Sequence, residues 1–418
     1  MKNSNPIDFY RTRCEKALAE QATISGWDSD LVTRQKGWIK EHAKKCHSLR
    51  ILSKLGQNDE AIQLQAKILS SFAARFSAKL YETKYGKKAK KVISPVAWSY
   101  YENQVDRIPL KAGGSGCCYV HLAVKSNGQK RWLNEPWTRT RQAQRALANV
   151  LAARLPLNDS EYNMKGKGRD AAVAEIKRLI EANGVKTFIV FDLANYFSSV
   201  RPEHLQWLKL PKQVLEHTVF FNHKAVQFTQ KDLLNKTKPA RLGLPQGAMV
   251  SGIIASALLK REICRLDGVL GEVTYVDDGV LSVASTSQAH KIAQVLQMQF
   301  AKLPGGPISF KKIDVRDISE GFELLGYWIQ KTGGTDDGTL VVIPSHPSKM
   351  KFKKNLYSRF RKEGPTLDYG KAEDVFEQYF KRWRNSFAHW TPNPEELDYT
   401  KGQLECWIGD FPMPIKPS

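Results

Sequence analysis

The chain has 418 residues, and its 64 Lys and Arg against 42 Asp and Glu give a formal net charge of +22 at pH 7. With 42% hydrophobic and 10% aromatic residues it can bury a sizeable core, which excludes a disordered or collagen-like protein. The excess of positive charge is more than solubility requires and favours a polyanionic partner, above all nucleic acid.

Membrane and secretory classes are disfavoured by the same sequence. The longest uncharged apolar stretch, 247–259, is too short to span a bilayer. The first residues lack the apolar segment of a secretory signal. The six cysteines include no C-x-x-C pair, so we interpret them as reduced thiols without structural zinc. We therefore expect a cytosolic protein that does not associate with a membrane.

Residues 1–95 are expected to form a helical, basic N-terminal extension. Apolar residues recur there at near-helical spacing, with breaks expected at Gly26, Gly56 and Gly86. Positive charge has little acidic counterweight in this region. It is carried by Arg34, Lys36, Lys40, Lys44, Lys45, Arg50 and Lys54, and again within residues 79–91. Two interpretations stay open, a solvated helical face and a nucleic-acid contact.

Short strands and turns are expected to follow. The apolar run 119–124 closes near an Asn-Gly dipeptide, which is typical of a tight hairpin. Lys125, Lys130 and Arg131 would lie at its tip. A basic helix is expected over 138–155, where arginines alternate with leucine and valine.

Two later patterns end in carboxylates. The buried-strand pattern 187–192 ends at Asp192, and two apolar arms within 272–283 meet at Asp277 and Asp278. A lone Asp after a strand is usually a helix cap or turn residue, and an Asp-rich turn can be ordinary. Adjacent acids between two apolar strands nevertheless repel each other unless a cation neutralises them.

A metal ion satisfies that requirement. Asp192, Asp277 and Asp278 would together offer hard oxygen ligands of the kind that Mg²⁺ prefers. Two Mg²⁺ ions about 3.5–4 Å apart can activate an attacking hydroxyl and stabilise the leaving oxygen of a phosphoryl transfer. Because the same cluster would suit a nuclease, the residues alone leave a polymerase and a nuclease open.

Four segments in chain order distinguish between these alternatives. They are Phe-Asp-Leu-Ala-Asn-Tyr-Phe at 191–197, Gly-Leu-Pro-Gln-Gly at 243–247, Tyr-Val-Asp-Asp at 275–278 and Leu-Leu-Gly-Tyr at 324–327. Together and in this order they resemble the palm motifs of reverse transcriptases. The resemblance covers roughly residues 110–330, and a basic thumb beyond them more loosely.

The resemblance implies an α+β fold of the right-hand polymerase type, with fingers, palm and thumb and an antiparallel palm sheet. The chain would divide into the helical extension 1–95, fingers and palm at 96–330, and a helical basic thumb with a proline-containing tail at 331–418.

The resemblance also assigns roles to the acids and to the nucleotide pocket. Asp192, Asp277 and Asp278 would bind two Mg²⁺ ions, for which Mn²⁺ can substitute, with the Leu193 carbonyl as a further ligand. Gln246 would line the nucleotide pocket.

Three basic residues and one aromatic residue would complete that pocket. Phe197 would be the steric gate that excludes ribonucleotides, and a core phenylalanine is the alternative. Lys125, Lys130 and Arg131 would contact the incoming triphosphate, and a generic basic hairpin is the alternative.

Further residues would act on the primer, the template and the leaving group. Arg169 follows a basic, glycine-rich segment before a helix and resembles the second finger motif, which contacts template or nucleotide. We favour Lys312 as the lysine that protonates pyrophosphate, with Lys311 left open. Leu325 and Gly326 would form the primer grip, although an edge hairpin packed only for stability remains an alternative.

The implied activity is RNA-directed DNA synthesis. The sequence lacks the Asn-Ala-x-x-His element of retron enzymes, and it has Val276 where group II intron proteins usually have Ala. The remaining resemblance is to bacterial defence-associated reverse transcriptases of the unknown-group and abortive-infection class. It implies a cytoplasmic bacterial enzyme in antiphage defence, with dNTPs as substrates, a structured noncoding RNA as template and cDNA as product.

Several alternatives stay open. They are an untemplated or protein-primed DNA polymerase, a retron-like or group II intron-like enzyme, an RNA polymerase and, as the least favoured, a non-catalytic RNA-binding scaffold.

Overall fold

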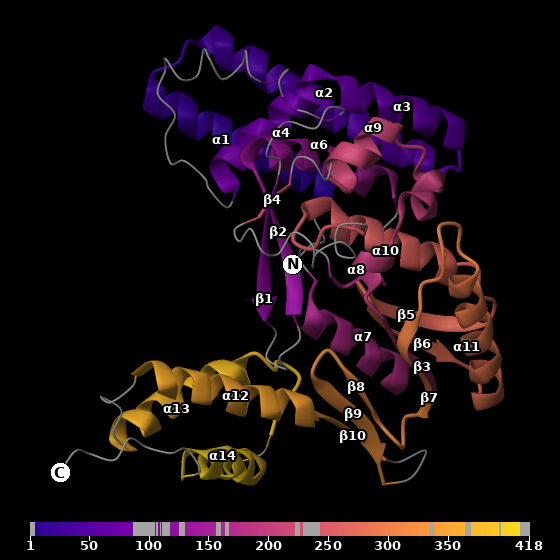
Figure 1. Cartoon of the computed structure of the whole chain (residues 1–418), viewed down its shortest axis with the longest axis vertical. Coiled ribbons are helices and arrows are strands. Elements are labelled where there is room, and N and C mark those ends of the chain that lie inside the picture. The colour runs from indigo at the N-terminus through magenta and orange to yellow at the C-terminus, as the bar shows by residue number, and fades with distance from the viewer. Residues whose placement is uncertain are drawn as a thin grey trace.

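The computed structural model describes residues 5–86, 105, 108, 110, 118–124, 130–155, 160–163, 167–221, 226–228, 243–333, 338–363, 369–392 and 394–409. Over these residues the chain is an α+β protein in which helices cover antiparallel sheets (Figure 1). None of the helices in these ranges is both long enough and apolar enough to cross a membrane.

The N-terminal part is helical, as its periodicity predicts. It contains α1 (Pro6–Ser25), α2 (Ser29–Lys54), α3 (Asn58–Ser70) and α4 (Phe72–Tyr85). The three expected breaks are confirmed. Gly26 caps α1 with a left-handed backbone (φ 59°), Gly56 follows α2 with φ 72°, and Gly86 caps α4. The rest of the expected helical stretch, 87–92, lies outside the described residues.

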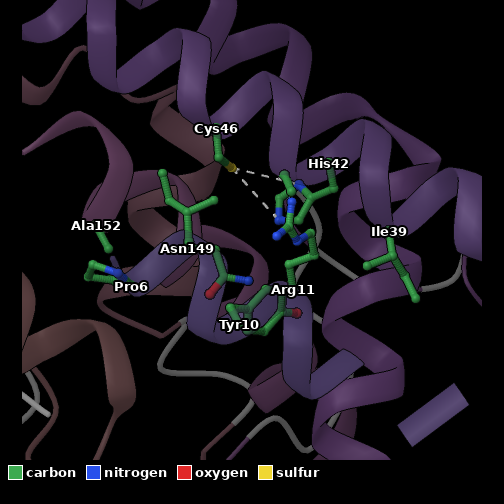
Figure 2. A pocket seen from close by; sticks show the side chains of 10 residues that line it. Pro6, Tyr10, Arg11, Ile39, His42, Cys46, Asn149 and Ala152 are labelled. Carbon is green, nitrogen blue, oxygen red and sulfur yellow. Dashed lines mark hydrogen bonds between the residues drawn. The ribbon is translucent and has the colours of Figure 1, made fainter. Parts of the chain in front are cut away.

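Helices α1 and α2 pack on α6 (Thr138–Arg154), which confirms the helix expected over 138–155. A small cavity of about 40 Å³ lies between them, with Tyr10 and His42 in its lining (Figure 2). Burial lowers the pKa of His42 to about 4, so its imidazole is neutral. The Cys46 Sγ lies 3.9 Å from each ring nitrogen of His42. His42 therefore adds no positive charge to the interior of this helical part.

A buried ion pair also joins the N-terminal helices to α6. The Glu82 carboxylate on α4 is 2% exposed and lies 3.3 Å from Arg141 and 2.9 Å from Arg145. Each arginine reaches a different carboxylate oxygen, so both oxygens are engaged. The contact is thus built into the packing rather than lying on the surface.

The strands form three sheets. The largest has the antiparallel order β5–β6–β3–β7, from β3 (Thr187–Leu193), β5 (Val269–Tyr275), β6 (Asp278–Val283) and β7 (Phe310–Asp317). β1 (Cys118–Val124) and β2 (Lys130–Pro136) form the expected antiparallel hairpin, which β4 (Val226–Phe228) joins in parallel. The third sheet contains β8 (Phe322–Leu324), β9 (Tyr327–Thr332) and β10 (Thr339–Pro344). Strand β10 has no counterpart among the expected elements, and β9 crosses the expected boundary at residue 331.

The remaining elements are mostly helical. They are α7 (Arg169–Glu181), α8 (Tyr196–Ser199), a 3₁₀ turn (Pro202–Leu208), α9 (Lys212–Val214), a π turn (Leu215–Val219), α10 (Met249–Ile263), α11 (Thr286–Ala301), α12 (His346–Glu363), α13 (Tyr369–Asn385) and α14 (Pro394–Gly409). The prolines interpreted as part of a tail include Pro394, which instead begins α14. Proline suits this position because the first turn of a helix needs no N–H donor there.

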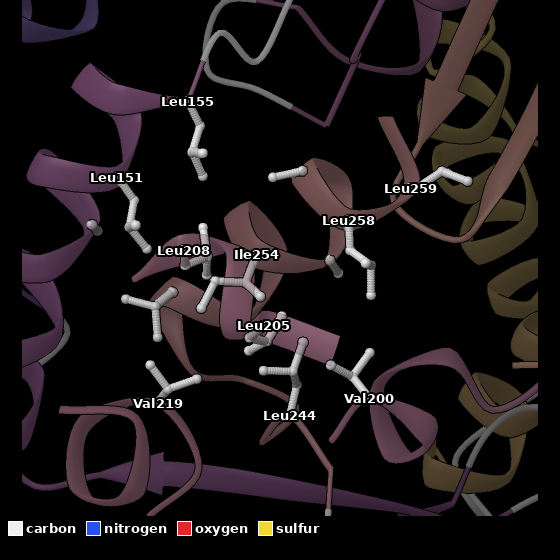
Figure 3. Packing of buried hydrophobic residues seen from close by; sticks show 14 of the residues in the cluster. Leu151, Leu155, Val200, Leu205, Leu208, Val219, Leu244, Ile254, Leu258 and Leu259 are labelled. Carbon is white, nitrogen blue, oxygen red and sulfur yellow. The ribbon is translucent and has the colours of Figure 1, made fainter. Parts of the chain in front are cut away.

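Strand β3 separates two cores because its side chains alternate between the faces of the sheet. Ile189 and Phe191 belong to the larger core, which extends between α6, α10 and the 3₁₀ turn (Figure 3). Val190 belongs to the other core with α7 and the third sheet. Phe387 and Trp390, which follow α13, are also buried in this second core.

Candidate active site

The carboxylates predicted to hold metal lie at one end of the four-stranded sheet. Asp192, near the end of β3, stands directly opposite Asp278, the first residue of β6. Asp277 lies in the two-residue turn between β5 and β6. The Leu193 N–H donates to the Asp277 carbonyl over 3.0 Å, which ties the end of β3 to that turn. Two motifs that are distant in the sequence therefore meet.

The electrostatics of this strand end favour a cation. Partial burial and the charges of Asp192 and Asp277 raise the pKa of the Asp278 carboxyl to about 7. Lys311 provides one positive charge, since its ammonium forms an ion pair with Asp192. The hydrogen bond to Asp192 raises the pKa of Lys311, so the lysine remains protonated. One cation thus faces three carboxylates.

The donor set fits divalent metal in its chemistry. Among the described residues, no three His, Cys, Asp or Glu side chains come together closely enough to hold a metal ion by themselves. Mg²⁺ is usually bound by one or two carboxylates plus substrate phosphates, so a complete protein cage is not required. Asp192 and Asp278 supply such a pair, because they stand opposite each other on neighbouring strands. The raised pKa of the Asp278 carboxyl is consistent with carboxylates held close together.

The glycine after the acids is explained by packing. A Cβ at Gly279 would lie 2.2 Å from Cζ of Phe191, which is the strand partner of Gly279. Phe191 is 2% exposed and holds β3 against the larger core. In the Asp-Asp-Gly sequence, the missing side chain of Gly279 therefore leaves space for the Phe191 ring next to the two acids.

The two candidate lysines lie in different surroundings. Lys312 is opposite Asp192 in the strand register, but its ammonium lies 3.4 Å from Asp314. Lys311 lies at the register shift of β7 and reaches Asp192 instead. The lysine at the acids is therefore Lys311, whereas the preferred candidate from the sequence was Lys312.

The predicted gate lies against the Gly-Leu-Pro-Gln-Gly segment. Phe197 on α8 is half-buried at the edge of the larger core, and its carbonyl accepts the Leu244 N–H over 2.7 Å. Gly243 makes this approach possible, because a Cβ there would lie 2.3 Å from the Phe197 oxygen. The Gln246 carbonyl accepts the Asn134 N–H of β2 over 2.7 Å. The structure thus brings together α8, the Gln246 segment and β2.

The predicted triphosphate contacts are described only in part. Lys125 lies outside the described residues. Lys130 and Arg131 are the first residues of β2, where their backbones pair with Val124 and Ala123 of β1. The same strand reaches Gln246 through Asn134.

Arg169 lies in an aromatic cluster. Its guanidinium carbon is 4.9 Å from the ring centroid of Tyr327 and 4.5 Å from that of Phe387. The Tyr327 hydroxyl bonds to Asp170 over 2.8 Å. Because Tyr327 begins β9, this cluster connects the start of α7 with the hairpin that contains Leu325 and Gly326.

Leu325 and Gly326 form the turn between β8 and β9, with φ values of 50° and 87°. The Gly326 carbonyl accepts hydrogen bonds from the Ser345 N–H and the Ser348 hydroxyl, both over 2.9 Å. The start of α12 therefore holds this turn.

One acidic residue near this site has no role in the sequence predictions. The charge of Glu323 on β8 contributes to the raised pKa of Asp278. Its carboxylate also accepts the Ser345 hydroxyl over 2.8 Å. In the sequence, Glu323 stands two residues before Leu325, inside a predicted hairpin. This position alone does not indicate that β8 approaches the acids.

Known proteins resemble this chain in part. Residues 123–329 match the family model described as reverse transcriptase (RNA-dependent DNA polymerase). The chain is similar to telomerase from Candida albicans in complex with a TWJ fragment of telomeric RNA, with 13% identity over 75% of this chain and 62% of that one and a TM-score of 0.32. It is also similar to apo telomerase from Candida tropicalis truncated from its C-terminal domain, with 14% identity over 58% and 59% of the two chains and a TM-score of 0.35.

The chain thus spans 62% and 59% of the length of these telomerase chains. None of the curated proteins compared with it matches. The family match contains all four of the motifs singled out in the sequence, and the acids at the strand end lie inside it. Residues 123–329 of this chain therefore match a reverse transcriptase (RNA-dependent DNA polymerase) domain.

Proposed function

We propose that the chain copies RNA into DNA with Asp192, Asp277 and Asp278 as its catalytic acids. The observation that carries this proposal is the meeting of the acids at one strand end inside the matched domain. The carboxylates and the Leu193 carbonyl would hold two Mg²⁺ ions, or Mn²⁺ in their place. Bound metal would activate the primer hydroxyl and stabilise the leaving oxygen.

The surrounding elements receive roles in the same proposal. The four-stranded sheet would be the palm, the β1–β2 hairpin part of the fingers, and α12–α14 the thumb, within the divisions 1–95, 96–330 and 331–418. Arg169 would act on the template side. The turn at Leu325 and Gly326 would position the primer end, which its hydrogen bonds to the start of α12 support.

The residues around the nucleotide would act by contact with the triphosphate and the sugar. Gln246 would line the pocket, and Lys125, Lys130 and Arg131 would contact the phosphates. Lys311, in its ion pair with Asp192, is better placed than Lys312 to donate a proton to pyrophosphate.

Replacing Phe197 with alanine is expected to weaken the discrimination against ribonucleotides by roughly tenfold or more, because a ring that crowds the 2′-hydroxyl would be gone. The measurement is kcat/KM for dTTP and for UTP on one RNA template. Ser198→Ala, next to Phe197 in α8, is the control and should keep the selectivity. Unchanged selectivity in Phe197→Ala would show that Phe197 is only a core residue.

A structured noncoding RNA is the proposed partner, and α2 offers a surface for it. Lys36, Lys40 and Lys44 are exposed and follow one another at four-residue spacing, so they lie about 6 Å apart along the helix. Like charges at this spacing destabilise a helix, whereas a phosphate backbone would neutralise them. In Figure 1, α2 lies at the end of the molecule opposite α12–α14.

Changing Lys36, Lys40 and Lys44 together to alanine is expected to weaken RNA binding and to reduce the slope of log K against log[salt] by about 2–3. The measurement is a salt titration of RNA binding. The matched control changes three exposed lysines elsewhere, namely Lys67, Lys291 and Lys302. An equal loss in both triple variants would indicate only a general effect of net charge.

The proposed setting is antiphage defence in the bacterial cytoplasm, and it rests on the sequence resemblance. Sequencing the RNA and DNA that copurify with the native protein tests it, because template, strand and product are read together. Recovery of one defined RNA with complementary DNA supports the proposal. DNA without a matching RNA, or DNA covalently attached to the protein, would favour untemplated or protein-primed synthesis.

A further inference from the structure

Segment 160–163 lies along the edge of strand β5. The Thr274 N–H donates to the Ser160 carbonyl, and the Tyr162 N–H donates to the Thr274 carbonyl, each over 2.8 Å. Glu161 thereby forms a parallel bridge with Thr274. Lys260 of α10 holds the segment through the Ser160 hydroxyl at 3.2 Å. The backbone thus places Glu161 beside the strand that leads into the acidic turn.

The Glu161 side chain is buried and accepts hydrogen bonds from several neighbours. The residue is 4% exposed. Its carboxylate accepts the Asn163 N–H over 2.8 Å and the Thr274 hydroxyl over 3.4 Å. The Ser256 side chain and the backbone N–H of Val276 also interact with this carboxylate and lower its pKa. Burial raises the pKa of Glu161, and these hydrogen bonds oppose that rise.

Val276 has an unfavourable backbone conformation. It is the first of the two residues between the paired Tyr275 and Asp278, and its φ is 63°. Asp277 is not among the residues with positive φ. A two-residue turn with positive φ only at its first residue resembles a type II′ turn, in which that position is normally glycine. A β-branched residue keeps such a conformation only where its surroundings hold it.

We infer that Glu161 is a positioning residue that holds the Val276–Asp277 turn in its strained conformation. Its carboxylate accepts a hydrogen bond from Thr274 on the incoming strand, and it interacts with the backbone N–H of Val276 in the turn. It thereby fixes where Asp277 and Asp278 stand relative to Asp192. Because Glu161 is buried, it would act through the turn rather than by contact with a substrate. The inference rests on the proposed function, because it matters for catalysis only if these acids carry the reaction.

Glu161→Gln tests the inference, because the amide keeps the size of the side chain but replaces an acceptor oxygen with a donor. We expect kcat per active site to fall about 10–100-fold and the half-saturating Mg²⁺ concentration to rise. The affinity for primer–template should stay unchanged. The assay is dTTP incorporation on a riboadenylate template with a deoxythymidylate primer. Burst amplitude counts the competent sites, so a purely structural loss would lower the amplitude alone.

A second variant tests whether Glu161 acts through the backbone of Val276. Val276→Gly should make the turn less dependent on Glu161, since glycine adopts positive φ without strain. Glu161→Gln should therefore cost less kcat in the Val276→Gly background than in the wild type. An equal cost in both backgrounds would overturn the inference.

The matched control is Glu262→Gln on α10. The Glu262 side chain is 0% exposed and forms an ion pair with Arg265, so it is at least as buried as Glu161. Wild-type kcat and metal dependence in Glu161→Gln, or equal losses in Glu161→Gln and Glu262→Gln, would overturn the inference.

The failure of the proposed function would be recognised separately. If Asp278→Asn is inactive and Glu161→Gln behaves like the wild type, only the inference fails. If Asp278→Asn keeps full activity, the proposed site fails and the inference fails with it.

Discussion

Asp278→Asn is expected to reduce primer extension on an RNA template by at least about a thousandfold. The substitution keeps the shape of the side chain but removes a negative charge beside Asp192 and Asp277, where a bound cation would be held. Asp192→Asn and Asp277→Asn should have effects of the same order. Single-turnover extension with dNTPs and Mg²⁺ measures the loss directly.

The control for this series is Asp314→Asn. Asp314 is also a carboxylate of the four-stranded sheet, but it pairs with Lys312 and Arg316 on its own strand. Its substitution should change the rate only slightly. A rate within tenfold of the wild type for Asp278→Asn would show that these acids are not the catalytic centre. Phage protection that survives in inactive variants would favour the scaffold alternative.

Glu82→Ala is expected to destabilise the chain by about 3–5 kcal/mol, because it leaves Arg141 and Arg145 without their buried partner. Loss of either arginine alone should cost less, since one cation would still neutralise Glu82. The measurement is the midpoint of thermal or urea unfolding, followed by the far-UV signal of the helices.

Glu20→Ala is the control for this prediction. Glu20 on α1 pairs with Lys84 on α4, so this contact also involves α4, but both side chains are solvent-accessible. Exposed ion pairs contribute little to stability. A midpoint for Glu82→Ala that equals the one for Glu20→Ala would contradict the role of Glu82 as a buried connection.

The sequence predicted the elements whose pattern is local. The buried-strand pattern of 187–192, the paired arms of 272–283 and the helical spacing of 138–155 reappear as β3, the β5–β6 hairpin and α6. The Asp-rich turn was recognisable because adjacent acids are costly between apolar strands. That Asp192 meets this turn was expected from the chemistry of a metal site and from the resemblance, because strand order cannot be read from periodicity.

What the sequence could not supply depends on tertiary contacts. A register shift in β7 brings Lys311 rather than Lys312 to Asp192, and no local pattern indicates that shift. Glu161 precedes strand β5 by more than a hundred residues, and its backbone meets Thr274 through a bridge at the edge of the sheet. Strand β10 was missed because its apolar run merged with the expected helical region.

The burial of Phe387 and Trp390 beside Val190 has a consequence for the order of folding. These residues lie near the end of the chain, whereas Val190 belongs to the strand that carries Asp192. At synthesis rates of about 5–20 residues per second, roughly 200 residues take ~10–40 s to emerge after β3. Over that time α7 and the third sheet can already pack on this face, but the part of the core that Phe387 and Trp390 complete is still open. Closure of the core behind the strand that carries Asp192 is therefore among the last events in the folding of the chain during its synthesis.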